Sequence, residues 1–306
     1  MCGLYEAPSS RGGLCFGSGL STYLRVRILE GLVRLISVLI LTRNEQQDLS
    51  GCLQSVKWSD DIHVFDSFST DRTVDMAKEA GATVHQRVFD DYATHRNAAL
   101  QGIRFHHPWL LFLDADERVS MELGKEMQRV VLSPPPEVGG YMVRRRDYLF
   151  GSWLKHAQIS PFYLRLVRPE QARYTRAINE VLQVSGRVGQ LEGPLEHFPF
   201  SKGIGHWVRK HDLYSTMEAE LIFRQQGLNE PSLQKALASK DFLERRLHQK
   251  ALFYRLPGRP LLKWLYMMFF RGAILDGAAG VTYATLQSIY EYLIVLKTKE
   301  LRRGGA

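Results

Sequence analysis

A short apolar stretch near residue 110 ends in a cluster of acidic side chains. Residues 109–113 are Trp, Leu, Leu, Phe and Leu, and Asp114, Asp116 and Glu117 follow directly. A bounded apolar run predicts a buried strand, and ligands of open α/β sheets bind just past the carboxyl ends of strands. Crowded carboxylates repel one another, and a divalent cation such as Mg²⁺ or Mn²⁺ relieves that repulsion. An isolated Asp-x-Asp is more often a solvated acidic turn, so the rest of the chain must decide.

The composition is that of an ordinary globular protein with a basic surplus. The chain has 306 residues, of which 45% are hydrophobic and 24% charged, and its net charge is +8. This length allows one large domain or two smaller ones. The positive charge favours an anionic partner, such as nucleic acid, anionic lipid or a diphosphate-bearing substrate, without choosing among them. The cysteines lack metal-ligand spacing, so no disulfide framework is indicated and a reducing cytosol fits.

Strands and helices are predicted to alternate in the first part of the chain. Strands are expected at residues 35–41, 62–65, 83–86 and 110–113, and helices at 48–56, 73–80 and 92–105. Such alternation implies right-handed βαβ units and a mostly parallel sheet, so the fold class is α/β. Further strands are expected at residues 140–143, 162–167 and 177–184, and helices from residue 205 onward.

Polar residues follow three of the predicted strands. They occupy residues 42–45, 66–71 and 114–117. Because the carboxyl ends of parallel strands face the same side of a sheet, these residues are expected to converge, although they are far apart in sequence. Convergence of three loops is more specific than any single motif, and it favours a binding site at this edge.

Together these segments resemble family 2 glycosyltransferases of the GT-A fold. The resemblance rests on residues 36–45 (ISVLILTRNE), 66–73 (DSFSTDRT), 95–100 (HRNAAL) and 113–117 (LDADE). More narrowly, they resemble the bacterial lipopolysaccharide-core β-glucosyltransferase subgroup over roughly residues 35–298. The resemblance implies a Rossmann-like, mostly parallel sheet with flanking helices. It also implies an inverting, metal-assisted transfer of a hexose such as glucose from a nucleotide-diphosphate donor.

The resemblance places residues of the first two loops beside the nucleotide. Asp66 would accept a hydrogen bond from the base, since a carboxylate suits the imide N–H of uracil. Thr42 and Glu45 would line the same base and ribose pocket. Helix capping is the alternative role of Asp66, although Asp71 is better placed to cap the helix or brace the loop.

Four further residues are expected near the sugar and the diphosphate. Asp114 would approach the ribose or a metal-bound water, and Arg96 and Asn97 would lie near the diphosphate or the sugar. A solvated helix face is the alternative for Arg96. Arg165 lies in an apolar strand and needs an anionic partner if it is buried, for which the donor diphosphate or an acceptor phosphate qualifies.

The metal and the catalytic base are expected on separate segments. Asp116 would bind Mg²⁺ or Mn²⁺ directly, and His197 is a further candidate ligand, with a structural role as the alternative. Inverting displacement needs a base to deprotonate the acceptor hydroxyl, and Glu180 is the candidate. Asn179 stands where the family usually has His, which weakens this match. Glu117 is the second candidate base, with bracing of the metal loop as its alternative role.

The sequence divides into three regions. Residues 1–34 are expected to be a flexible extension without a signal-peptide core, 35–204 a GT-A catalytic domain, and 205–306 a helical region. Residues 261–296 mix aromatic and aliphatic side chains with cations, which favours helices lying in a membrane interface. A helical cap packed on the sheet domain and a re-entrant hairpin are the alternatives. No stretch of 18 apolar residues occurs, so a spanning helix is not expected.

The expected partners are a nucleotide-sugar donor such as a UDP-sugar, a lipid-linked or glycan acceptor, and an anionic membrane surface, but no nucleic acid. The expected location is cytoplasmic, on the inner face of a bacterial inner membrane. A haloacid dehalogenase-type phosphatase is the alternative function, but that family needs Thr or Val where Arg118 stands. An oxidoreductase would need a Gly-x-Gly-x-x-Gly turn after residues 35–41, and a nucleic-acid binder rests on charge alone.

Overall fold

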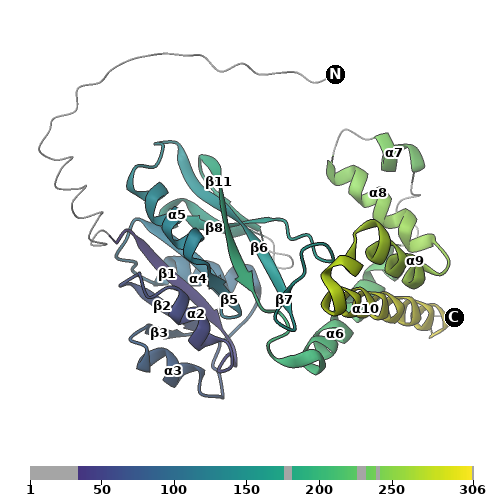
Figure 1. Cartoon of the computed structure of the whole chain (residues 1–306), viewed down its shortest axis with the longest axis horizontal. Coiled ribbons are helices and arrows are strands. Elements are labelled where there is room, and N and C mark those ends of the chain that lie inside the picture. The colour runs from purple at the N-terminus through teal and green to yellow at the C-terminus, as the bar shows by residue number, and fades with distance from the viewer. Residues whose placement is uncertain (1–33, 176–180, 226–231, 239–241, 305–306) are drawn as a thin grey trace, which may run out of the picture.

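The computed structural model describes residues 34–175, 181–225, 232–238 and 242–304. Figure 1 shows a sheet with flanking helices at one end of the molecule and a group of helices at the other. The long strands β6 (Val138–Leu149) and β11 (Arg187–His197) extend from the sheet toward these helices.

The sheet is parallel in its first half and mixed in its second half. Its strand order is β3-β2-β1-β4-β8-β6-β11-β5, with β7 paired to β6. The parallel half consists of β3 (Thr83–Gln86), β2 (Ile62–Asp66), β1 (Ile36–Thr42) and β4 (Trp109–Asp114). The mixed half adds β8 (Phe162–Val167) antiparallel to β4 and β6, β11 parallel to β6, β5 (Glu117–Val119) antiparallel to β11, and β7 (Ser152–Trp153). The predicted α/β class is confirmed.

Helices cover both faces of the sheet, which explains why β1 and β4 are almost continuously apolar. One face packs against α2 (Leu49–Ser55), α3 (Thr73–Glu79) and α5 (Met121–Leu132). The other face packs against α4 (Tyr92–Gly102). The two sides of β1 illustrate this division, because Ile40 belongs to the first cluster and Leu39 to the second.

The predicted elements differ from the observed ones mainly at their ends. The helix expected at 92–105 ends at Gly102, because Ile103 has an extended backbone. The strand expected at 140–143 continues as β6 through the basic run to Leu149. The strand expected at 177–184 is β10 (Val181–Val184), which pairs with β9 (Ala172–Thr175), while residues 177–180 lie outside the described residues. A 3₁₀ turn, η1 (Pro169–Gln171), precedes β9.

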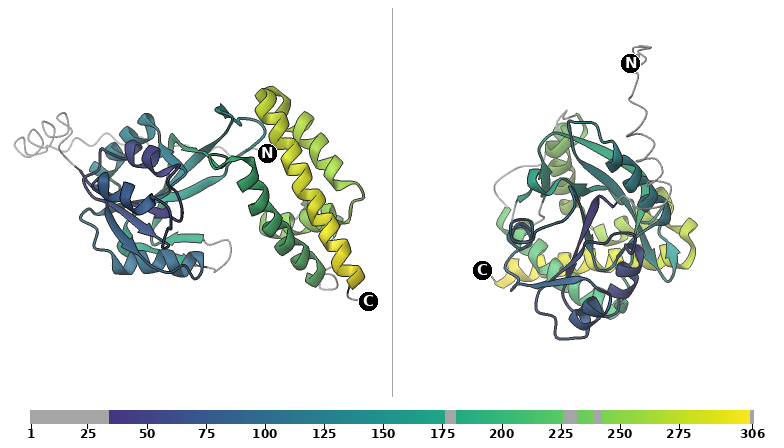
Figure 2. Two further views of the ribbon diagram at one scale, coloured as in Figure 1. Left: turned by 90° about the horizontal axis from the view of Figure 1, so that it is seen from below. Right: turned by 90° about the vertical axis from the view of Figure 1, so that its left-hand side faces the viewer.

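The C-terminal region is helical, as predicted. It comprises α6 (Gly203–Gln225), α7 (Leu233–Ala238), α8 (Phe242–Arg255), α9 (Arg259–Leu265), a π-helical turn η2 (Tyr266–Phe270), a 3₁₀ turn η3 (Ala273–Asp276) and α10 (Gly277–Gly304). Figure 2 shows α6 and α10 side by side, extending away from the sheet.

The inner side of this region is docked on the end of the sheet domain. The Asp276 carboxylate accepts hydrogen bonds from the backbone N–H groups of His156 (2.8 Å) and Ala157 (2.7 Å). The Tyr283 hydroxyl donates to Gln158 (2.6 Å).

A buried apolar cluster also joins the two regions. It contains Leu149 and Leu154 of the sheet domain together with Met267, Met268, Ala273 and Ala284 of the helical region. A packed cap, the alternative to the interface prediction, therefore describes this inner side.

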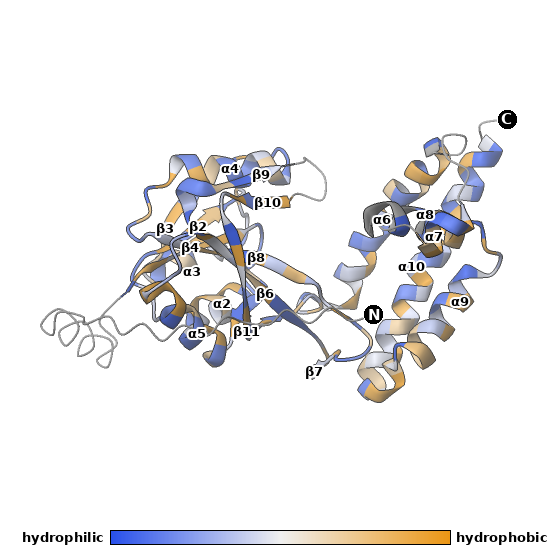
Figure 3. Ribbon diagram, turned by 90° about the horizontal axis from the view of Figure 1, so that it is seen from above, coloured by the Kyte–Doolittle hydropathy of each residue, from blue (hydrophilic) through white to orange (hydrophobic). Residues whose placement is uncertain are grey.

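The outer side of the same region exposes large apolar side chains. Phe270 is 86% exposed, Leu275 71% and Phe269 63%. Figure 3 shows apolar residues along α9 and the turns that follow it. Within the described ranges, no helix is long and apolar enough to cross a membrane.

Candidate active site

The first two predicted loops are joined through Asp66. This carboxylate is fully buried at the end of β2, beside Thr42 at the end of β1. Its Oδ1 accepts from the hydroxyls of Thr42 (2.9 Å) and Ser69 (2.5 Å). Its Oδ2 accepts from the Ser69 backbone N–H (2.8 Å) and the Gln86 amide (3.1 Å). Binding of a base N–H would have to displace one of these donors, so the predicted base contact stays a prediction.

Glu45 is held at the same edge by a lysine outside the predicted set. Lys202 Nζ lies 2.5 Å from Glu45 Oε1, and Glu45 Oε2 is buried without a hydrogen-bond partner among the described residues. Burial raises the pKa of Glu45 to about 7, although Lys202 lowers it, and nearby Asp116 adds to the rise. The pocket-lining role of Glu45 stays a prediction, and the oxygen without a partner among the described residues is the atom it would use.

Arginines neutralise two of the three acids at the carboxyl end of β4. Asp114 Oδ1 lies 3.1 Å from Arg96 Nη2, and Asp114 Oδ2 lies 2.9 Å from Arg165 Nη2. Arg165 also lies 2.6 Å from Glu117 Oε1, and Arg145 lies 3.5 Å from the same oxygen. Burial opposes ionisation of Asp114, but Arg165 and Arg96 outweigh it and hold the pKa of Asp114 well below its usual range.

This ion network assigns structural tasks to several residues. Glu117 is fully buried, and its Oε2 accepts from the Asp114 backbone N–H (3.0 Å), so it braces the loop. Arg165 finds its anionic partners inside the protein rather than in a ligand. Contact of Arg96, Asp114 or Arg165 with a donor stays a prediction.

Asn97 links α4 to the hairpin strand β9. Its amide donates to the Tyr174 carbonyl (2.8 Å) and accepts from the Tyr174 backbone N–H (2.8 Å). Both ends of the side chain are therefore used in a two-point backbone contact. This arrangement positions the hairpin, and a direct contact of Asn97 with the donor stays a prediction.

Asp116 differs from its two acidic neighbours because it faces a histidine. His197 Nε2 lies 3.4 Å from Asp116 Oδ2, and the Asp116 side chain is 30% exposed. His197 lies opposite both Asp147 of β6 and Glu117 of β5 in the strand register. His197 Nδ1 lies 2.5 Å from Asp147 Oδ1, and the Ser160 hydroxyl donates to the other oxygen of Asp147.

The protonation of His197 follows from these contacts. Burial alone lowers the pKa of His197, but Asp116 and Asp147 outweigh it and raise the value to about 9. Burial likewise opposes ionisation of Asp116, but His197 holds the pKa of Asp116 below its usual value. Without a metal the two residues thus form a charged pair, and metal binding has to displace the histidine proton.

Asp116 and His197 could supply part of the coordination shell of a divalent metal ion, with a substrate supplying the rest. Within the described ranges, no group of three or more His, Cys, Asp and Glu side chains is arranged to hold a metal ion. The pair Asp116 and His197 suits an ion that takes its remaining ligands from phosphate oxygens, as Mg²⁺ and Mn²⁺ sites often do. Asp147 orients the imidazole through Nδ1 and leaves Nε2 directed at Asp116, an arrangement typical of metal-binding histidines.

Three basic residues at the start of α6 complete this edge. Lys202 directly precedes α6, and His206 and Lys210 are four positions apart, which places these two on one face of the helix. Lys210 helps to lower the pKa of Asp116, and the charge of Asp116 is felt at His206. The sequence prediction missed these residues, although their helical spacing was a usable signal. Glu180, the predicted base, lies outside the described residues.

The sequence comparisons identify the family of the chain. The family model described as Glycosyl transferase family 2 matches residues 37–189, which is half of the 306-residue chain. The chain therefore belongs to the family 2 glycosyltransferases and is a transferase enzyme. This membership leaves the phosphatase alternative without support.

Individual relatives cover different shares of the chain. The Rhizobium meliloti protein named lipopolysaccharide core biosynthesis glycosyltransferase LpsC is 27% identical over 272 residues, or 86% of this chain and 91% of that protein. An uncharacterized glycosyltransferase of Rickettsia conorii is 34% identical over 215 residues, or 64% of this chain and 73% of that one. The crystal structure of S. aureus TarS 1-349 in complex with UDP matches 88% of this chain and 92% of that chain, with 14% identity and a TM-score of 0.44.

Proposed function

We propose that this protein is an inverting, metal-assisted glycosyltransferase that builds a cell-envelope glycan. It moves a hexose, with glucose as the first candidate, from a nucleotide-diphosphate sugar to a lipid-linked or lipopolysaccharide acceptor. The observation that carries the proposal is the meeting of Asp116 and His197 with the basic face of α6 beside Glu45. The name of the Rhizobium meliloti relative supports a lipopolysaccharide-type acceptor.

The chain offers separate groups for the two ends of the donor. Thr42, Glu45 and Asp66 would line the base and ribose, with uracil as the preferred base because Asp66 is a carboxylate acceptor. The unpaired Glu45 Oε2 suits a ribose hydroxyl. Lys202 and Lys210 lie near enough to Asp116 to attract the diphosphate electrostatically.

Asp116 and His197 would hold Mg²⁺ or Mn²⁺ at the diphosphate. A bound ion would act as a Lewis acid that stabilises the charge of the leaving diphosphate. Asp147 keeps the His197 ring in position, and the arginine-neutralised Asp114 and Glu117 keep the Asp116 loop in place. The side chains of this loop are thus organised before the substrate arrives, which is how enzymes stabilise developing charge efficiently.

Glu180 remains our candidate for the base that removes the acceptor hydroxyl proton. Its position in the sequence lies between β9 and β10, and Asn97 anchors that hairpin to α4. The acceptor would reach the site on the cytoplasmic face of a membrane, with the enzyme held peripherally at an anionic lipid surface. The exposed apolar side chains of the C-terminal region support this location.

A binding and turnover experiment on Asp116→Asn tests the proposal. UDP is titrated by calorimetry with and without Mn²⁺, and transfer from a panel of labelled nucleotide sugars to bacterial membranes is measured. We expect Mn²⁺ to strengthen UDP binding to the wild type but not to the variant, and transfer to fall by at least about a hundredfold.

Asp75→Asn is the matched control, because Asp75 is an exposed aspartate on α3 outside the site. It should behave as the wild type in both measurements. Equal, metal-independent UDP binding by the wild type and Asp116→Asn would refute the metal role. Absence of transfer from every nucleotide sugar would refute the function itself.

A further inference from the structure

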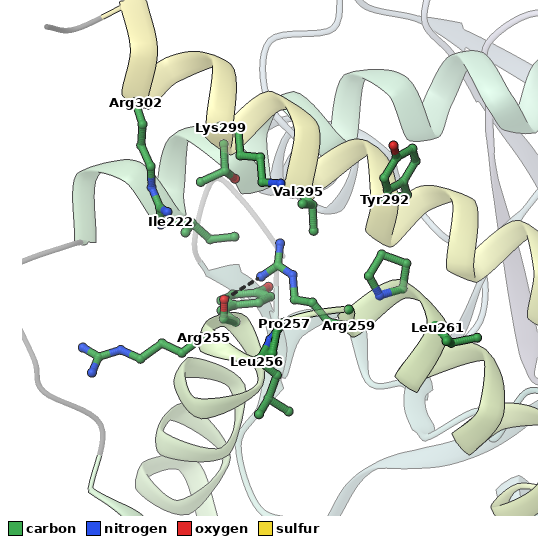
Figure 4. A pocket seen from close by; sticks show the side chains of 14 residues that line it. Ile222, Arg255, Leu256, Pro257, Arg259, Leu261, Tyr292, Val295, Lys299 and Arg302 are labelled. Atoms are coloured by element: carbon green, nitrogen blue, oxygen red, sulfur yellow. Dashed lines mark hydrogen bonds between the residues drawn. The ribbon is translucent and has the colours of Figure 1, made fainter.

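A pocket lies in the helical region, apart from the site on the sheet. It has a volume of about 590 Å³ and is formed by α6, the connection from α8 to α9, and the last part of α10 (Figure 4). This size is sufficient for a polar headgroup with part of an attached chain. None of the functional residues described above lines it.

The charge of the pocket lining has one sign. Arg255, Arg259, Lys299 and Arg302 line the pocket, and none of the described residues that line it is acidic. Figure 4 shows Arg302 and Arg259 extending toward each other from α10 and from the start of α9. Within the described residues, neither Lys299 nor Arg302 forms an ion pair, so these charges are available to a ligand.

Two carboxylates of the described residues, Glu291 and Glu218, lie behind the pocket. Glu291 on α10 is buried and lies 3.1 Å from Arg259 Nε and 3.7 Å from Lys263 Nζ. Glu218 of α6 accepts a hydrogen bond from the Tyr254 hydroxyl (3.0 Å). Lys299 and Arg302 have no ion pair among the described residues. Burial lowers the pKa of Arg259, and nearby Arg302 lowers it further, as expected where cations crowd together.

The rim of the pocket is apolar and open to solvent. Leu256, Leu261 and Tyr292 line it and are 46%, 62% and 53% exposed. Ile289 and Leu296 are 48% and 42% exposed, and their spacing from Tyr292 places them on the same face of α10. A cationic pocket beside exposed apolar side chains is complementary to an anionic amphiphile.

We propose that this pocket binds the phosphate headgroup of an anionic membrane lipid, with the exposed apolar rim in the acyl layer. Lys299 and Arg302 contact the phosphate directly, and Arg259 supplies charge from behind. The proposal rests on the proposed membrane-surface location, but not on the donor, the metal or the base. It gives the enzyme a lipid site separate from its active site.

The test measures lipid binding by the full-length protein without donor or transfer. Dihexanoylphosphatidylglycerol, dihexanoylphosphatidylcholine (both below their critical micelle concentrations) and inorganic phosphate are titrated by calorimetry. We expect saturable binding of dihexanoylphosphatidylglycerol, and at least tenfold weaker binding of dihexanoylphosphatidylcholine and of inorganic phosphate. Arg302→Gln should weaken binding about fivefold, because a cation near a lipid surface contributes roughly that factor.

Arg303→Gln is the matched control, because Arg303 is the adjacent exposed arginine of α10 and does not line the pocket. It should bind the lipid as the wild type does. Equal losses in Arg302→Gln and Arg303→Gln would reduce the effect to general surface charge and overturn the proposal. Inorganic phosphate binding as tightly as the lipid would also overturn it, since the site would then serve a soluble anion.

Flotation of the same proteins with vesicles extends the test to a membrane. Wild type and Arg303→Gln should float with phosphatidylcholine vesicles that contain phosphatidylglycerol, and the double variant Lys299→Gln/Arg302→Gln should float poorly. Flotation of the double variant at the wild-type level would contradict the pocket's role. Failure of sugar transfer in a separate assay would leave these outcomes unchanged, so the two proposals can fail independently.

Discussion

The carboxyl edge of the sheet gathers acidic side chains that arginines balance, whereas the pocket of the helical region gathers cations with no acid in its described lining. At the edge, Arg96, Arg145 and Arg165 neutralise Asp114 and Glu117 at distances between 2.6 and 3.5 Å. In the pocket, Arg259 pairs with Glu291 behind the lining, whereas Lys299 and Arg302 form no ion pair among the described residues. Buried charges inside a fold need partners, whereas charges open to solvent can await a ligand.

This difference shows where ligands are expected in this molecule. At the edge, arginines balance Asp114 and Glu117, and Asp116 is the acid that faces His197 instead of an arginine. In the pocket, the unbalanced charges are themselves the recognition feature. Substitutions at the edge should therefore act on stability where charges are paired and on ligand binding where they are not.

Arg165→Met should have the largest effect on stability. Removal of this buried guanidinium leaves Asp114 and Glu117 with fewer partners, so the free energy of unfolding should fall by about 3–5 kcal/mol. Urea denaturation monitored by circular dichroism measures it. Arg187→Met, which breaks an exposed pair with Glu137 at 3.0 Å, should cost less than about 1 kcal/mol. Similar losses of stability in both variants would mean that the buried edge network stabilises the fold no more than an exposed ion pair does.

Glu45→Gln should change the pH dependence of stability. The folded-state pKa of Glu45 is raised to about 7, so its stabilising contribution is present below about pH 4.5 and is lost as the pH rises through 7. Lys202, Asp116 and Asp48 are the charged groups that act on it.

We therefore expect the free energy of unfolding of the wild type to fall, relative to that of Glu45→Gln, by on the order of 1–2 kcal/mol between pH 5 and pH 8, after allowance for solvent screening. Urea denaturation at the two pH values measures this difference. Glu79→Gln, at an exposed glutamate of α3, serves as the control and should follow the wild type. Parallel pH profiles for the wild type and Glu45→Gln would show that Glu45 is already ionised and paired in the folded state.

Lys210→Ala should have the smallest effect. Lys210 lies on the exposed face of α6 and acts on Asp116 through space, so its loss should weaken UDP binding about fivefold at low salt. The difference should shrink as the salt concentration increases, because exposed charges are screened. Arg209→Ala removes the adjacent exposed charge and should have less effect. If Lys210→Ala binds UDP as tightly as Arg209→Ala and the wild type do, the basic face of α6 does not recognise the diphosphate.

Much of the fold could be predicted because local patterns and the global arrangement agree. The strand at residues 83–86 and the strand at 162–167 were placed correctly, since both are short apolar or alternating runs with clear ends. The basic run in β6 was not recognised as strand. Its cations lie against aromatic rings, as Arg144 does 4.4 Å from Phe162, and sequence patterns do not reveal such pairing.

The candidate site could be predicted only in part, for a related reason. The acids and the histidine were found because their residue types and motif positions are informative. Their partners were missed, since Lys202 and Arg145 come from segments far from Asp116 and carry no motif. The motif predicts Asp116 as the metal ligand and Glu117 as a brace, but it does not reveal that arginines neutralise Asp114 and Glu117.

The α/β class, the family and the convergence of three polar loops at one sheet edge follow from the amino-acid sequence, because they depend on local periodicity and on motifs. The folded structure was needed to show which acid pairs with a histidine and which acids pair with arginines, since these pairings depend on distances between side chains remote in sequence. It also decided that the C-terminal helices are docked on one side and exposed on the other. Composition cannot separate these two faces, because packing alone determines which apolar side chains meet a partner.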